Sequence, residues 1–105
     1  MKLLSIEYIP GVEFEALEMV KGTVVQSKNL GKDFMAGMKT LVGGEIAGYT
    51  QMLNEARQIA VKRMVDEAKA LGADAVVGVK YGSSQIMQGA AEIVAYGTAV
   101  KYLNK

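Results

Sequence analysis

The longest regular pattern in the chain is a stripe of apolar positions that recur three and four residues apart. It predicts one amphipathic helix from about Glu45 to Leu71, and its members are Tyr49, Met52, Leu53, Ala56, Ile59, Ala60, Met64, Ala68 and Leu71. Gly72 predicts the end of this helix, because glycine readily takes the left-handed conformation of the residue after a helix. Such a helix is about 40 Å long. We therefore expect it to project beyond its own sheet or to pack on a neighbour.

A shorter helical stripe precedes the long one. Its apolar positions are Phe34, Met38, Leu41 and Val42, which predict a helix over residues 29–42. Asn29 or Asp33 is the expected cap of this helix, and Gly43-Gly44 is its expected stop. In the long helix, the spacing also predicts two i,i+4 charge pairs, Lys62–Asp66 and Arg63–Glu67.

Stretches rich in β-branched residues predict four strands, Leu3–Ile9, Phe14–Lys28, Ala75–Tyr81 and Ala90–Leu103. Pro10-Gly11 predicts a turn after the first strand. Gly22, inside the second, predicts a bulge or a close approach of another backbone. A two-residue turn at Gln88-Gly89 would place Tyr81 opposite Tyr96 and Val77 opposite Val100.

Neither face of the C-terminal hairpin is clearly polar. Ala75, Val77, Val79 and Tyr81 share one side of its first strand, while Val76 lies on the other. An antiparallel sheet with one solvated face alternates apolar and polar residues, and one helix covers only one face of a small sheet. We therefore infer that another subunit covers the second face. The alternative is that the short helix covers it.

Composition narrows the chemistry of this chain. Its 105 residues predict a single domain over 1–105, and a folded monomer of 11.2 kDa exposes roughly 5,700 Å². The absence of cysteine and histidine rules out disulfides, thiol nucleophiles and imidazole-based acid–base chemistry. We therefore expect no enzyme and no cofactor. A net charge of +1 does not suggest a nucleic-acid partner.

Neither a signal peptide nor a membrane span is predicted. Glu7 and Pro10-Gly11 interrupt the apolar start of the chain, and no run approaches about 18 apolar residues. The expected location is cytoplasmic.

A set of residues in fixed order along nearly the whole chain resembles a known family. They are Gly22-Thr23-Val24-Val25, Asn29, Asp33, Ala36-Gly37, Val42-Gly43-Gly44, Tyr49, Arg57, Ala60, Gly72-Ala73-Asp74-Ala75-Val76-Val77-Gly78-Val79 and Gly97-Thr98-Ala99-Val100. Together they resemble the YbjQ-like family. The resemblance implies an α+β subunit of the dodecin-like type, with an antiparallel sheet against one long helix and a short helix. It also implies a ring-forming homo-oligomer, with a pentamer the expected form.

The family carries the label "putative heavy-metal-binding", which finds little support in the residues of this chain. Soft and borderline metals prefer thiolate or imidazole ligands. Met35 and Met38 are helical neighbours that could hold Cu(I), although such pairs more often fill a core. We expect no tight intrinsic Zn²⁺ or Cu²⁺ site. The alternative function is a carboxylate-based divalent or heavy-metal binder, with carboxylates brought together between subunits.

Two groups of residues are candidates for binding a small anionic ligand. Gly43-Gly44-Glu45 precedes the long helix, where free N–H groups attract anions. The alternative is that these glycines only let two helices meet at a sharp angle. Arg57, beyond Tyr49 on the long helix, is suited to bind a ligand carboxylate or phosphate. Its alternative role is a salt bridge to Asp33 or Asp74, which we expect to be structural or inter-subunit polar residues.

The strand tyrosines are a further candidate. Tyr8, Tyr81, Tyr96 and Tyr102 would form either an aromatic ligand patch or cross-strand packing pairs.

Overall fold

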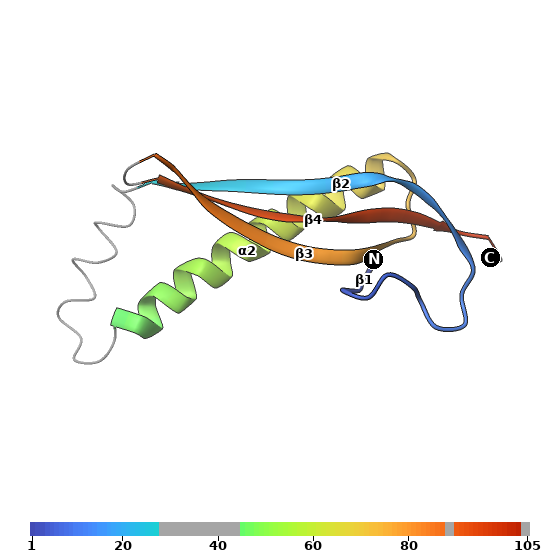
Figure 1. The fold of residues 1–105 in the computed structure, drawn as a ribbon, viewed down its shortest axis with the longest axis horizontal. Coiled ribbons are helices and arrows are strands. Elements are labelled where there is room, and N and C mark those ends of the chain that lie inside the picture. Colours follow the sequence, from blue (N-terminus) through green and yellow to red (C-terminus); the bar gives the residue numbers. More distant parts are fainter. Residues whose placement is uncertain (28–44, 88–89, 104–105) are drawn as a thin grey trace.

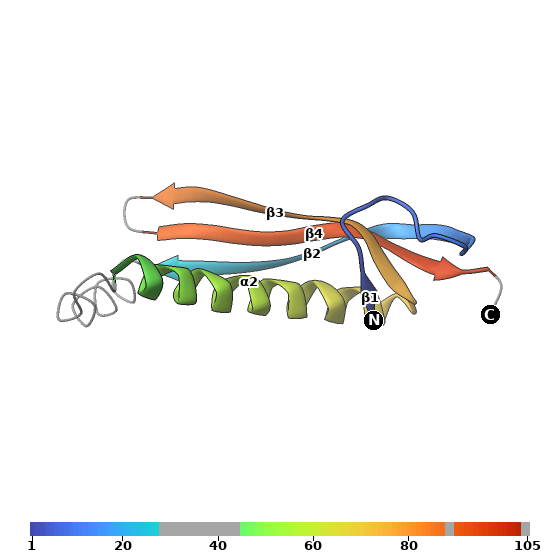
Figure 2. The same cartoon turned by 90° about the horizontal axis from the view of Figure 1, so that it is seen from below.

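The described residues form a single mixed sheet with one helix along one of its faces (Figures 1 and 2). The computed structural model describes residues 1–27, 45–87 and 90–103. The strands lie in the order β1-β3-β4-β2, and their bounds are β1 Lys2–Leu3, β2 Phe14–Ser27, β3 Ala75–Met87 and β4 Ala90–Tyr102. Helix α2 spans Glu45–Ala70. The predicted α+β class, with one long helix against a largely antiparallel sheet, is confirmed. The predicted helix over residues 29–42 lies outside the described residues.

The predicted first strand is mostly wrong. Only Lys2–Leu3 forms a strand, and it pairs with β3 in parallel. The reason is a bulge in β3, where Gly78 has a φ of 63°, a conformation that other residues rarely adopt. There the chain leaves the regular ladder, and Gly78 N donates to Ile6 O at 2.8 Å. The predicted turn at Pro10-Gly11 is confirmed by the bond from Val12 N to Ile9 O at 3.0 Å.

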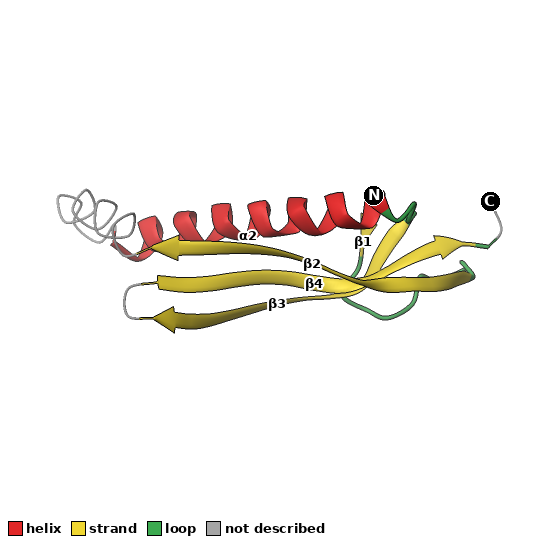
Figure 3. Ribbon diagram, turned by 90° about the horizontal axis from the view of Figure 1, so that it is seen from above, coloured by secondary structure: helices red, strands yellow, loops and turns green. Residues whose placement is uncertain are grey.

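The long helix agrees with its prediction to within a residue at its C-terminal end. Gly72 has a φ of 77°. Its N–H donates to Lys69 O, and Ala73 N donates to Ala68 O, which together make a Schellman motif. The N-terminal end of α2 extends past the ends of the strands, which is one of the two predicted alternatives (Figures 1 and 3). The rest of the helix lies along the sheet. At 14 residues β2 is about 46 Å long, so sheet and helix run side by side over most of their length (Figure 3).

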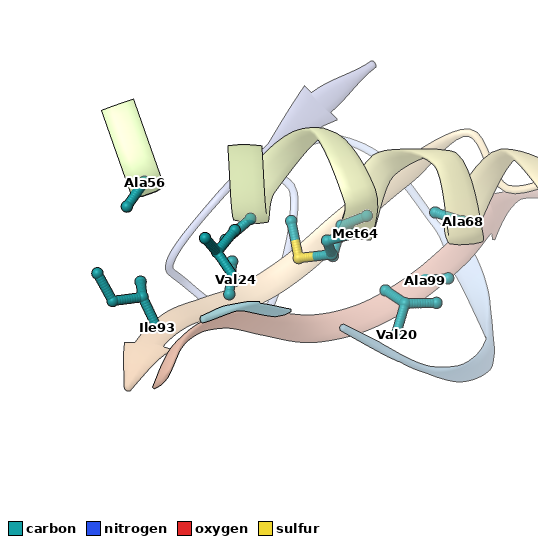
Figure 4. Close-up of a cluster of buried hydrophobic side chains, with 10 residues drawn as sticks. Val20, Val24, Ala56, Met64, Ala68, Ile93 and Ala99 are labelled. Atoms are coloured by element: carbon teal, nitrogen blue, oxygen red, sulfur yellow. The ribbon is translucent and has the colours of Figure 1, made fainter. Parts of the chain in front are cut away.

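The main core lies between α2 and the inner face of the sheet. Four positions of α2, each four residues apart, are fully buried, namely Ala56, Ala60, Met64 and Ala68. They pack on β2 and β4 (Figure 4) through Val20, Val24, Ile93, Ala95 and Ala99. The buried stripe is narrower than predicted, because Ile59 and Leu71 remain partly exposed.

Gly22 is the point of closest contact between the two layers. A Cβ built at this glycine would lie 1.9 Å from Ala60 O and 2.5 Å from Met64 N. The predicted close backbone approach is therefore confirmed, and the bulge in β2 lies elsewhere, between Ala16 and Glu18. Because both colliding atoms belong to the helix backbone, no side-chain rotation could make room for a larger residue.

Two charged side chains of α2 bind the free edge of β2. Lys21 N donates to Glu67 Oε1 at 3.3 Å, and Arg63 Nη1 donates to Thr23 O. The predicted ion pair between Arg63 and Glu67 is thus replaced by two contacts with strand backbone, while Lys62–Asp66 forms at 2.9 Å as predicted. These contacts hold α2 over β2. The helix accordingly packs most on β2, less on β4 and least on β3 (Figures 2 and 3).

The predicted hairpin register is correct only next to the turn. Met87 pairs with Ala90, as a two-residue connection requires. Bulges at Ile86 and at Gly78–Val79 each shift the register by one residue, so Tyr81 lies opposite Ala95 and Val77 lies opposite Thr98. Both predicted pairs, Tyr81–Tyr96 and Val77–Val100, are therefore wrong. The second bulge also lets Val76 and Val79 both contact the main core.

The second face of the sheet is covered at one end by the segment between β1 and β2. This segment passes on the side opposite α2 (Figure 3), and its Ile9 is buried against Ala75, Val77 and Val100. The remainder of this face, here called the outer face, consists of residues that pair across β3, β4 and β2 below that cluster. They are Lys80, Gly82, Ser84, Glu92, Val94, Tyr96, Thr98, Met19, Lys21, Thr23 and Val25.

The close approach at Gly22 yields a direct test. Gly22→Ala should lower the free energy of unfolding by at least about 3 kcal/mol, or prevent folding, because the added methyl group meets helix backbone. Gly82→Ala is the matched control, since its Cβ would meet side chains and not backbone, Val94 at 3.2 Å and Tyr96 at 3.9 Å. It should change stability by less than about 1 kcal/mol. Urea denaturation at one protein concentration measures both, and equal losses would contradict the structure.

Candidate functional site

Several of the predicted site residues cannot be placed. Gly43, Gly44 and Asp33 lie outside the described residues. Glu45 and Tyr49 belong to the first two turns of α2, and their side chains also lie outside the described part of the structure. Their roles in ligand binding remain predictions.

Arg57 is the predicted site residue that the structure places in a cavity. It lies on the flank of α2 that faces β3, where its Nη1 donates to Asn54 Oδ1 at 3.1 Å. One turn of helix thus orients the guanidinium, and this bond uses one of its five N–H donors. The cavity, here called the α2/β3 groove, has a volume of about 330 Å³ and is lined by Met52, Leu53, Arg57, Tyr81, Gly82, Ser83, Ala91 and Ile93.

The groove exists because α2 is displaced toward β2. Tyr81 pairs with Ala95 and Ser83 pairs with Ile93, so both residues of β3 face the side of the sheet that carries the helix. Ala95 and Ile93 are buried beneath α2, whereas Tyr81 is 54% exposed. At Tyr81 and Ser83, the inner face of β3 therefore forms a floor that α2 does not cover, and α2 forms one wall.

The walls of the groove are apolar with a cationic rim. Leu53 and Ile93 supply apolar surface, and the hydroxyl groups come from Tyr81 and Ser83. An adjoining depression of about 470 Å³ shares Arg57 and Tyr81 and adds Asn54, Gln58, Val61 and Lys62. Among the described residues no carboxylate lines either cavity. This combination favours an anion with an apolar body.

Asp74 joins the beginning of β3 to the end of β4. Its Oδ2 accepts a hydrogen bond from Tyr102 N at 2.8 Å, and its own N–H donates to Val100 O at 2.8 Å. These contacts support the predicted structural role. Arg57 lies about 20 Å along the helix axis from the end of α2 next to Asp74. The proposed salt bridge between them is therefore not formed within one chain.

A second hollow lies on the outer face. It has a volume of about 510 Å³, and its lining includes Glu7, Met19, Lys80, Tyr96 and Thr98. Because Glu7 and Lys80 carry opposite charges, this hollow does not select for one sign of ligand. It is the larger and the more open of the two cavities.

Within residues 1–27, 45–87 and 90–103, no three acidic side chains gather as metal ligands. In the same ranges, no helix combines the length and apolarity of a membrane span.

The sequence singles out Arg57 as a candidate, but not the residues that line the groove with it. Tyr81 was weighed as part of an aromatic patch or as a cross-strand partner of Tyr96. The register shift at Gly78–Val79 instead turns it to the helix side of the sheet. Ser83 and Ile93 offered no signal, because only the position of α2 makes them line a cavity.

Comparison with known proteins gives a consistent result. The chain is 59% identical over 103 residues to a UPF0145 protein of Clostridium novyi, covering 98% of this chain and all of that protein. It is 61% identical over 102 residues to one from Thermotoga petrophila, covering 96% of each. A crystal structure of a DUF74-family protein from Pediococcus pentosaceus shares the fold, with a TM-score of 0.62, 18% identity and 97% of each chain covered. The YbjQ-like family profile described as "Putative heavy-metal-binding" matches residues 1–103, and the chain belongs to that family.

Proposed function

We propose that this protein is a non-enzymatic homo-oligomer, with a pentamer the expected form, that binds a small anionic ligand. The observation that carries the proposal is the outer face. Met19 is 67% exposed there, Val25 is 59% exposed and Tyr96 is 37% exposed. The cluster under Ile9 covers one end of this side of the sheet. From Met19 to Val25 along β2, the described residues leave the outer face uncovered. A second copy of the chain is the proposed cover.

The shape of the chain supports this proposal. Its accessible surface is 6968 Å², against about 5,700 Å² for a typical folded monomer of its mass, an excess of about 1,300 Å². The radius of gyration is 16.9 Å, whereas a globular domain of 100 residues has about 13 Å. An interface of standard size buries about 800 Å² on each partner. The excess surface is therefore enough for at least one such interface.

The charges on the outer face suit self-association. Lys21 and Lys80 lie on it together with Glu92, and Glu7 borders its hollow. A face that carries both signs can complement a copy of itself, whereas a face of one sign would repel it.

We propose that the protein is not an enzyme because of the kinds of polar side chains that the chain and its groove contain. General acid–base chemistry without histidine or cysteine needs carboxylates, lysines or tyrosines held close together. The groove at Arg57 offers one cation and two hydroxyl groups among its described lining, which suits recognition of an anion rather than its turnover. We also propose that the protein is cytoplasmic, because its sequence predicts neither a signal peptide nor a membrane span.

Oligomer size is the direct test of this proposal. Wild-type protein at micromolar concentration should sediment as one closed oligomer. Met19→Lys should shift it to smaller species, because a buried lysine in the interface has no partner for its charge. Ile59→Lys is the matched control, since Ile59 is a partly exposed apolar residue on α2, and it should leave the oligomer intact.

A stable wild-type monomer would overturn the homo-oligomer. If Ile59→Lys dissociates the assembly and Met19→Lys does not, the interface lies on the helix side and the outer face is wrongly assigned.

The family description raises metal-dependent assembly as a separate question. The described carboxylates do not cluster, and the chain has no thiolate or imidazole. We therefore expect native mass spectrometry to give the same oligomer mass before and after treatment with a chelator. Dissociation on chelation, or stoichiometric sub-micromolar binding of Zn²⁺ or Cu²⁺ by the untagged protein in calorimetry, would instead support a metal-binding function.

A further inference from the structure

We propose that the α2/β3 groove binds a small amphipathic anion, with its carboxylate on Arg57 and a planar apolar body between Leu53, Ile93 and Tyr81. This proposal deepens the ligand-binding part of the proposed function and rests on it. It assigns the ligand to the groove rather than to the larger hollow of the outer face.

The geometry of Arg57 is the first argument. The Arg57 side chain lines the groove, and its Nη1 donates to Asn54 Oδ1 one turn away on the same helix. Among the described residues Asn54 is its hydrogen-bonding partner, and no carboxylate lies within ion-pair distance of it. Four N–H donors of the planar fork are left, which is enough for the paired contacts that arginine makes with a carboxylate.

The contrast with the other cations of α2 is the second argument. Lys62 pairs with Asp66 at 2.9 Å, and Arg63 is engaged with the backbone of β2 at Thr23. Lys69 lies in the last turn of α2 and lines neither cavity. Among the described cations of α2, Arg57 is thus the one that lines the apolar groove. No acidic residue lines the groove beside it. A charge in that setting is complemented most readily by an anion from outside the chain.

The size and lining of the groove set the class of ligand. At about 330 Å³ it lies at the lower end of the range for small-molecule sites. Its floor is the ring of Tyr81 and the inner face of β3, and its wall is Leu53 on α2. A flat body of one or two rings fits between these layers, and the hydroxyl groups of Tyr81 and Ser83 add polar contacts at its edge.

The probe for the test is naphthalene-2-carboxylate, followed by amide chemical shifts of the full-length protein. Binding at roughly 0.1–1 mM is expected for a ligand of this size, with shifts concentrated at Ser83, Ile93 and Leu53. Arg57→Gln should weaken binding roughly 10- to 100-fold, the equivalent of one charge-assisted hydrogen-bonded pair. Arg57→Lys should lose part of that affinity, because lysine keeps the charge without the fork.

Two controls separate the charge from the apolar contact and the groove from the outer face. Naphthalene-2-carboxamide, which lacks the charge, should bind the wild type about as weakly as the carboxylate binds Arg57→Gln. Lys80→Gln removes a cation from the outer hollow and should leave carboxylate binding unchanged.

Three outcomes would overturn the proposal. They are no saturable shift in the wild type, equal affinity of acid and amide, or shifts that gather at Tyr96 and Thr98 on the outer face. Native mass spectrometry of the same Arg57→Gln sample keeps the two proposals apart. An intact oligomer that has lost the probe supports the groove, whereas a monomeric wild type that still binds the probe contradicts only the oligomer.

Discussion

The contact of α2 with β2 at Gly22 is the constraint on which the rest of this structure depends. Helix backbone can approach a strand this closely only where the strand residue has no Cβ, and at Gly22 the helix backbone of Ala60 and Met64 occupies that space. Arg63 and Glu67 then fasten the helix to the free edge of the same strand. This position of the helix fills the core. It also gives hydrogen-bonding partners to backbone groups on the exposed edge of β2.

The same placement determines what is left uncovered. A helix held over β2 covers β3 only at its beginning, where Val76 is buried, so the inner face of β3 farther along opens into the α2/β3 groove beside Arg57. On the opposite side, the segment containing Ile9 covers only one end of the sheet. The chain thus has two incompletely covered regions with different chemistry. The groove is apolar and cationic, whereas the outer face mixes exposed apolar side chains with polar side chains and charges of both signs.

The sequence was most informative where a feature is local and periodic. The 3.6-residue stripe located α2 and Gly72 located its end. Gly22 was expected to mark either a bulge or a close backbone approach, and the second is what the structure shows. The strand register away from the turn could not be predicted. A bulge such as that at Gly78–Val79 depends on hydrogen bonds with a neighbouring segment, here from Gly78 N to Ile6 O. The sequence also suggested that both faces of the C-terminal hairpin are apolar, and part of that impression comes from the unpredicted register. Val79 is returned to the helix side by that bulge, and Val77 is covered by the segment before β2.

The candidate site shows the same difference between features that are local in the sequence and features that depend on the tertiary structure. Arg57 was recognisable by residue type and position on a helix, but Tyr81 and Ser83 join it only through tertiary placement. The most direct measurement of that placement is a nuclear Overhauser experiment on selectively labelled protein. The structure predicts strong contacts from the Gly22 Hα atoms to Ala60 and Met64, with none from the Tyr81 ring to the Met64 methyl group. Strong contacts between Tyr81 and Met64, with none at Gly22, would place α2 over β3 and contradict both the groove and the account built on it.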